Sequence, residues 1–162
     1  MRKTATFLGL IALVACAAPV RAQDEETKAP LPHEQVLSAS PLLLVHKWFN
    51  VDYERRIAPA LTLGASALHM TGFNIGTAMF HVRFYPGRAA LSGFHIGVHT
   101  GVGYELRHRS IPGVGAEIGY AWLFGANRDV GLSLGIGSTR MFGADGAFNF
   151  PNLRVFNVGF AF

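Results

Sequence analysis

The sequence predicts an all-β fold, an eight-stranded antiparallel up-and-down transmembrane β-barrel. Half of its residues are apolar, and 19 glycines are spread along the chain. Several segments alternate strictly between apolar residues and small or polar ones, which is the period of a strand. After the N-terminal segment, no run of about 18 apolar residues could form a spanning helix. An exported apolar chain of this kind can pair its backbone in lipid only as a closed barrel.

Export is predicted by residues 1–22, which have the pattern of a secretory signal peptide. Arg2 and Lys3 precede an apolar stretch, and small residues lead up to an expected cleavage after Ala22. The alternative is a lipobox, L-V-A-C, in which Cys16 would be lipidated and retained. Cys16 is the only cysteine, so cleavage after residue 22 would leave no disulfide and no cysteine-bound metal.

The basic character of the chain belongs largely to this N-terminal segment. The full chain has a net charge of +4, and removing Arg2, Lys3 and Arg21 leaves 11 basic residues against 10 acidic ones. We therefore expect no nucleic-acid binding. Residues 23–35 are charged and contain prolines without any period, which predicts a flexible leader.

Eight period-two segments predict one barrel domain over residues 36–162. Their expected bounds are 36–46, 48–57, 60–70, 73–85, 92–105, 113–123, 129–140 and 152–162, with turn signals at 58–59, 86–87, 112–113, 125–128 and 143–146. Each segment is close to the ~9–11 residues that a tilted strand needs to cross a bilayer. Pro41 is awkward inside the first segment, because proline cannot donate to a strand ladder, and it indicates a bulge or a strand start.

The two faces of these strands differ in character. One face carries phenylalanine, tyrosine, tryptophan, valine and isoleucine, as a lipid-facing wall does. The other carries mostly glycine, serine and a few isolated charges, which suits the narrow interior of an eight-stranded barrel. The alternative is a water-soluble ligand carrier, in which the apolar rows would lie inside.

The last predicted strand alternates up to the final residue. Phe156, Val158, Phe160 and Phe162 fall on one side of it. This pattern is similar to the C-terminal signal by which bacterial outer-membrane barrels are recognised for assembly. We therefore expect the barrel-assembly machinery as a partner and the bacterial outer membrane as the location.

Together, these features resemble the small outer-membrane barrels of the OmpA transmembrane-domain and OmpX type. The stretches F-N-V-D-Y-E-R-R-I (49–57) and V-R-F-Y-P-G (82–87) are similar to a strand and a strand-to-turn segment of that superfamily. The resemblance covers residues 36–162. It implies a monomer surrounded by outer-membrane lipids and lipopolysaccharide, with a structural or surface-interaction role. The peptidoglycan-binding domain that follows the barrel in OmpA is not expected here.

The predicted interior face carries eight ionisable residues. They are Asp52, Glu54, Arg56, His81, Arg83, His95, His99 and Glu117. Because an unpaired charge in a dry interior is costly, we predict an ion-pair and hydrogen-bond network that plugs the lumen. The alternative, an ion path or narrow pore, is disfavoured because eight strands leave room only for side chains. His95 and His99 would be roughly 13 Å apart along one strand, so we expect no metal and no cofactor.

A possible catalytic group lies in R-H-R-S-I-P, a predicted loop. Lipid A 3-O-deacylase, another eight-stranded outer-membrane barrel, carries a His-x-Ser pair that His108 and Ser110 resemble. The resemblance would make Ser110 the nucleophile and His108 its base, with Glu105 as the orienting acid. However, Ile111 stands where that family has asparagine, and we expect no enzymatic activity.

Two surface features complete the sequence-based expectations. Arg107, His108 and Arg109 form a basic cluster that could contact lipopolysaccharide phosphates, or could be ordinary rim residues. The expected loop 142–151 carries three phenylalanines among glycines, and it could form an adhesive tip or fold onto the rim.

Overall fold

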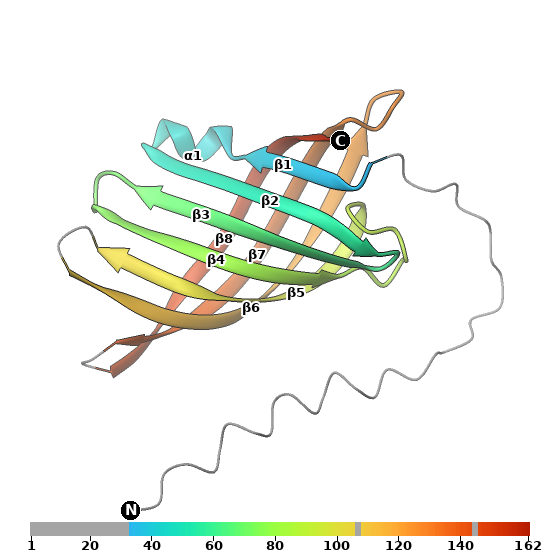
Figure 1. The fold of residues 1–162 in the computed structure, drawn as a ribbon. Helices are drawn as coiled ribbons and strands as arrows, with labels where there is room; N and C mark the ends of the chain where they lie inside the picture. The colour runs from blue at the N-terminus through green and yellow to red at the C-terminus, as the bar shows by residue number, and fades with distance from the viewer. Residues whose placement is uncertain (1–32, 106–107, 144–145) are drawn as a thin grey trace, which may run out of the picture. The chain divides into compact units, whose positions relative to one another are not determined.

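The computed structural model describes residues 33–105, 108–143 and 146–162, and these form a closed eight-stranded antiparallel barrel (Figure 1). The predicted all-β class and its up-and-down connectivity are confirmed. The strands are β1 (Gln35–Ala39), β2 (Trp48–Ala58), β3 (Leu61–Met70), β4 (Ile75–Phe84), β5 (Gly93–Glu105), β6 (His108–Phe124), β7 (Val130–Gly143) and β8 (Gly146–Ala161). The predicted signal peptide, Cys16 and most of the predicted leader lie outside the described residues.

The barrel closes where β1 pairs with β8. The pairing aligns Val36 with Ala161, and just beyond it the backbone N–H of Gln35 donates to the Phe162 carbonyl at 2.9 Å. We call the end that holds Gln35 and Phe162 the proximal end, on the right in Figure 1, and the opposite end the distal end. The distal end holds the helix α1 (Pro41–Val45) and the turn 71–74.

The prediction of one long first strand over 36–46 is wrong. β1 ends at Ala39, and Pro41 begins α1 instead of interrupting a strand. Proline suits the first helical position because the N–H it lacks would have no partner there, and its backbone angle is already helical. Ser40 precedes the helix in an extended conformation, and its hydroxyl donates to the Val155 carbonyl at 2.5 Å. Within the described residues, no helix is both long and apolar enough to span a membrane.

Two predicted connections are strands in the structure. The β7–β8 ladder continues to Gly143 opposite Gly146, so most of the expected loop 142–151 is hairpin. Pro112 lies within β6 and not in a turn. It is one residue beyond the β6–β7 ladder, which begins at Gly113, so its missing N–H is not required on that side.

A bulge in β8 changes which residues face inward. Asn157 is opposite Ser133 while Arg154 is opposite Gly135, so one more residue is accommodated on β8 than on β7. Phe156, within this bulge, has a positive φ of 48°. Because strand faces alternate with period two, the extra residue shifts the inward positions from even numbers before the bulge to odd numbers after it.

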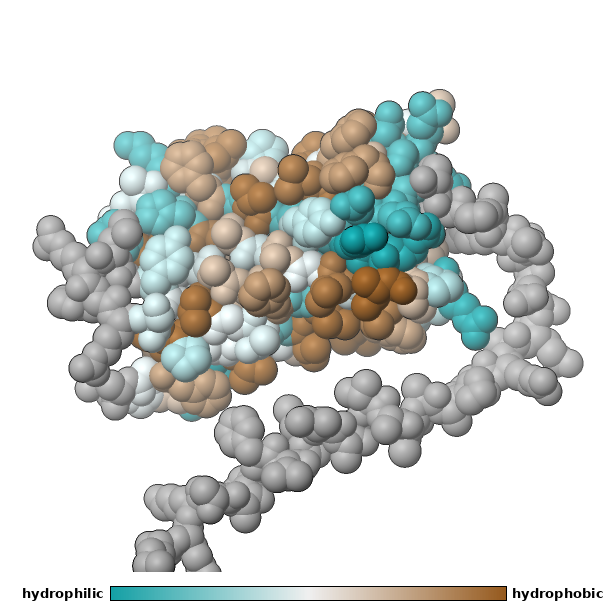
Figure 2. Space-filling view, viewed as in Figure 1, coloured by the Kyte–Doolittle hydropathy of each residue, from teal (hydrophilic) through white to brown (hydrophobic). Residues whose placement is uncertain are grey.

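The barrel wall presents apolar side chains outward and most charges inward. Phe80, Val98 and Ile136 are 67%, 60% and 58% exposed, whereas Asp52 and Arg83 are 5% and 1% exposed. Figure 2 shows brown and pale residues over much of the visible wall, with teal residues toward both ends and the larger teal group at the right-hand, proximal end. The inverted arrangement, with the apolar rows enclosed by the strands, is therefore wrong.

Three inward glycines provide space for imidazole rings on the neighbouring strand. The opposed pairs are Gly64 with His81, Gly115 with His99, and Gly119 with His95. A Cβ added at Gly119 would lie only 2.7 Å from His95 Nε2, and the other two glycines are approached more closely still. Three of the glycines predicted to face the interior thus lie directly against histidine rings.

Adding a methyl group at one of these contacts is expected to destabilise the barrel. Gly64→Ala should lower the free energy of unfolding by about 1–3 kcal/mol, because its Cβ would overlap the His81 ring and the Tyr53 carbonyl oxygen. Gly87→Ala is the matched control, since no described atom lies within 4 Å of a Cβ there. Urea titration of the refolded protein in detergent micelles would measure both, and equal effects would contradict the close packing.

Candidate functional site: a buried charge network

Five charged side chains meet inside the barrel, between its middle and its proximal end. We call them the charge network: Asp52, Glu54, Arg83, Glu117 and Arg154. They come from β2, β4, β6 and β8, so strands on opposite sides of the barrel are joined through its interior. All five are buried.

Arg83 is the centre of the charge network. Its Nε donates to Glu117 Oε1 at 2.6 Å, its Nη1 to Glu54 Oε2 at 2.5 Å and its Nη2 to Asp52 Oδ2 at 3.0 Å. A guanidinium group offers five N–H donors in a fixed plane, so it can hold several carboxylates at once. A single side chain thereby ties β4 to β2 and β6.

Arg154 is the second cation of the charge network, and it is not among the interior residues predicted from the sequence. Its Nη2 donates to Glu117 Oε1 at 3.1 Å and to Asp52 Oδ2 at 3.3 Å. Unbroken alternation from Phe156 would place Arg154 on the outer wall, but the β8 bulge turns it inward. An arginine directly continuing the row of Phe156, Val158, Phe160 and Phe162 was the available signal, because a charge facing lipid is costly.

The Glu54 carboxylate accepts hydrogen bonds from two neutral hydroxyl groups in addition to the Arg83 guanidinium. The Thr62 hydroxyl donates to its Oε1 at 2.5 Å, and the Tyr85 hydroxyl donates to the same oxygen at 2.7 Å. Tyr85 lies in the connection after β4, where burial and the nearby Glu54 carboxylate raise the pKa of its phenol well above the usual range. Tyr85 therefore keeps its proton and acts as a donor.

The three predicted interior histidines are buried around the charge network. His81 Nε2 lies 3.9 Å from Asp52 Oδ1, and His99 Nε2 lies 2.7 Å from Thr139 Oγ1. The His95 ring lies beside the Tyr85 ring, with 5.2 Å between centroids. Among the described residues, neither His95 nitrogen nor His81 Nε2 has a hydrogen-bond partner. Part of the interior polar surface is thus left unpaired by protein groups.

Arg56 is the predicted interior residue that the structure does not bring to this cluster. It is partly exposed and pairs with Glu34, with 3.5 Å between Arg56 Nη2 and Glu34 Oε1. It lies close to the proximal end of β2, where the register shifts between Arg56 and Ala58. The prediction assigned Arg56 to the inward face, which is correct. Because Arg56 lies so near the proximal end of β2, however, its side chain reaches the rim of the barrel. The other seven predicted residues are buried inside.

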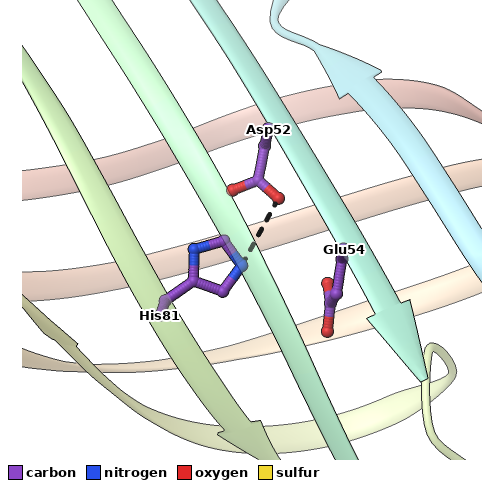
Figure 3. A group of neighbouring side chains, drawn as sticks. All are labelled: Asp52, Glu54 and His81. Atoms are coloured by element: carbon purple, nitrogen blue, oxygen red, sulfur yellow. Dashed lines mark ion pairs between the residues drawn. The ribbon is translucent and has the colours of Figure 1, made fainter. Parts of the chain in front are cut away.

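Asp52, Glu54 and His81 have the donor types of a cation site. One ligand atom from each lies within 4.8 Å of the others, and Figure 3 shows the two β2 carboxylates facing the β4 imidazole. However, the Arg83 guanidinium already binds both carboxylates, and Arg154 adds a second positive charge beside Asp52. A metal ion would have to displace these cations, so the site is better described as filled by arginine.

The possible catalytic group is only partly within the described structure. Ser110 is exposed and lies in β6, where the sequence predicted a loop. The backbones of Glu105 and His108 are paired across β5 and β6, but their side chains, and those of Arg107 and Arg109, lie outside the described residues.

All four residues of the predicted assembly pattern face outward. Phe156, Val158, Phe160 and Phe162 are 46%, 46%, 58% and 49% exposed. The rings of Phe160 and Phe162 stack with 6.3 Å between centroids. They form part of the apolar wall on the β8 side of the seam where β8 pairs with β1.

The fold and the charge network define a small closed β-barrel with a charged interior. Comparison with protein-family models, with curated proteins and with solved structures gave no match to this chain. The arrangement of its own residues is therefore the basis for inferring its function.

Proposed function

We propose that this protein is an integral β-barrel of a bacterial outer membrane, with a structural or surface-interaction role and a lumen closed by the charge network. The observation that carries the proposal is a wall of exposed apolar side chains around a barrel whose interior encloses five buried charged residues. In water, such a wall would be an apolar surface far larger than soluble proteins expose. In a bilayer, acyl chains would cover it, and barrel closure would pair the backbone.

The distribution of outward aromatic residues supports this proposal. Aliphatic residues such as Val98, Ile118 and Ile136 lie midway along their strands. Outward aromatic residues are frequent near both ends: Phe84, Phe94, Tyr120, Phe124, Phe160 and Phe162 proximally, and Phe49, Phe73 and Phe142 distally. Barrels that span a bilayer carry such aromatic girdles at the two interfaces.

The charge network favours a structural role over the alternative of a narrow pore. An ion crossing the barrel would have to pass Arg83, which is 1% exposed and bonded to three carboxylates. We expect no conductance steps from the purified protein in planar bilayers. Regular steps would contradict a closed lumen and favour the pore.

The proposal includes its surroundings and its assembly. The apolar wall would contact outer-membrane lipids and lipopolysaccharide, and the barrel-assembly machinery would insert it. We propose a monomer, because the sheet closes on itself through β1 and β8 without a partner chain. The resemblance to OmpA-type and OmpX-type barrels is part of the same proposal.

Tryptophan quenching tests whether the apolar wall contacts lipid. Trp122 lies beside outward-facing Tyr120, with 4.6 Å between ring centroids and the rings tilted by 34°, so it reports on the outer wall. In a Trp48→Phe variant refolded into vesicles, we expect phospholipids brominated along the acyl chain to quench Trp122 strongly, and aqueous iodide to quench it weakly. The Trp122→Phe variant, which keeps Trp48 at the distal end of β2, is the comparison.

The opposite result would overturn the membrane assignment. A folded monomer that stays in the aqueous phase, with Trp122 quenched by iodide and not by brominated lipid, would contradict it. Fractionation of cells that express the full chain tests the location separately, since the protein is expected with the outer membrane.

A further inference from the structure

The interior of the barrel is not charged throughout. At its distal end, it contains an apolar pocket of about 220 Å³. Residues from six strands, β3 to β8, line it, including Leu68, Ile75, Ile111, Met141, Phe148 and Phe150. The register places these residues inside: Ile111 is opposite buried Gly103, and Phe148 is opposite buried Met141. We call this the distal pocket.

Two structural features create the distal pocket. Phe148 and Phe150 face inward because they precede the β8 bulge, where even-numbered residues point into the barrel. Met141 is 3% exposed and lies against Gly103 and Gly113, where an added Cβ would overlap its Cε and Sδ atoms respectively. The glycines thus let a long flexible side chain pack across the wall and leave space beside it.

The distal pocket ends where the polar interior begins. Thr139, the next inward residue of β7 after Met141, is 1% exposed and lies 2.7 Å from His99 Nε2. Thr77 and Tyr104 are the two hydroxyl-bearing residues among those that line the pocket. A water molecule needs about two to four polar partners to be stable in a buried cavity, and this lining offers few.

We propose that the distal pocket binds one small hydrocarbon group, either a free monocyclic or short-chain molecule or the end of a lipid acyl chain. An apolar cavity of ~150 Å³ lined by leucine, isoleucine and phenylalanine stays dry and binds benzene. The distal pocket is larger than that, and smaller than the ~300–1,000 Å³ typical of drug-sized ligands. This binding does not depend on the proposed structural role, since the lining is internal.

Methionine methyl groups give a direct readout of binding. The described barrel contains Met70 and Met141, which line the distal pocket, and Met79, which is buried nearby against Gly101 and does not line it. With 13C-methyl methionine in the full chain, refolded into lipid nanodiscs, toluene should shift the Met70 and Met141 resonances in a saturable manner. The Met79 resonance should not move.

A matched pair of variants tests the location. Leu68→Trp fills the distal pocket and should weaken toluene binding about tenfold or more, whereas Leu63→Trp, on the outer wall of the same strand, should leave it unchanged. If Leu68→Trp does not fold, as judged by circular dichroism, Phe148→Ser serves instead. Phe148 is 47% exposed at the rim, and a serine there should also weaken binding.

The outcomes separate the two sources of the hydrocarbon group. Nuclear Overhauser contacts from lipid acyl protons to the Met141 methyl group before toluene is added would identify an acyl chain. Their absence, together with saturable toluene shifts, would identify a free molecule. The proposal is overturned if neither signal appears, or if Met79 shifts in parallel, which would indicate general partitioning into the bilayer.

Discussion

Arg83→Met is expected to lower the free energy of unfolding by about 3–5 kcal/mol, because it leaves three carboxylates in the interior without their main cation. Arg83 donates to Asp52, Glu54 and Glu117 at 2.5–3.0 Å while itself 1% exposed. Methionine keeps much of the side-chain volume, so the loss reports on charge pairing. Urea titration of the refolded protein, followed by tryptophan fluorescence, would measure it.

Three controls locate the cause of this loss. Arg140→Met removes an exposed arginine that bonds only Asn149 among the described side chains, at 3.2 Å, and should cost less than about 0.5 kcal/mol. The loss for Arg83→Lys should lie between the losses for Arg83→Met and Arg140→Met, since one ammonium group cannot reproduce a planar set of donors. Arg154→Met should cost less than Arg83→Met, because Arg154 reaches its carboxylates through a single nitrogen. Equal losses for Arg83→Met and Arg140→Met would contradict the network.

A double variant separates lost packing from stranded charge. Adding Glu54→Gln to Arg83→Met removes one of the unpaired carboxylates, so it should recover part of the lost stability. Glu54→Gln alone should destabilise, because glutamine has no charge and only one acceptor oxygen, whereas Glu54 uses one oxygen for Arg83 and the other for Thr62 and Tyr85. If the loss in the double variant equals the sum of the two single losses, the two residues are not coupled.

The inward and outward faces of most strands could be predicted from alternation alone. Asp52, Glu54 and Glu117 are correctly placed because each lies among small or polar neighbours two residues away. Their pairing could not be predicted, because it depends on which strands lie across the lumen from one another. The same holds for Gly64 and His81, whose close contact needs the register of β3 against β4.

The errors arise where one local choice changes the pattern. Alternation counted back from Phe156 assigns Arg154 to the outside, but the bulge reverses the face for every earlier residue of β8. The distal pocket could not be predicted either. Its Phe148 and Phe150 were expected in a loop, and they face inward because they precede the bulge. At Pro41, the backbone restriction of proline ends the strand period and begins a helical turn, even though the leucines that follow are apolar enough for a strand.

A charge placed midway along the outer wall is the second large effect that we expect. Phe80→Arg should lower the free energy of unfolding in lipid vesicles by about 2–4 kcal/mol, the cost of a cation at the bilayer midplane. Phe80 is 67% exposed in the middle of β4, opposite Ala65 and Thr100 on its neighbours. Phe80→Leu, which removes the ring without adding charge, separates the lost aromatic area from the charge itself.

Phe73→Arg is the matched control, because Phe73 is 66% exposed but lies in the turn 71–74 at the distal end. Near the interface, the same substitution should cost only about 0–1 kcal/mol. In a barrel surrounded by water, both arginines would be solvated, and the two variants should be equally stable or should both gain solubility. Because the two phenylalanines are almost equally exposed, the difference in stability loss between Phe80→Arg and Phe73→Arg measures the surroundings of the wall and not its packing. A difference near zero would argue that the apolar wall lies against something other than lipid.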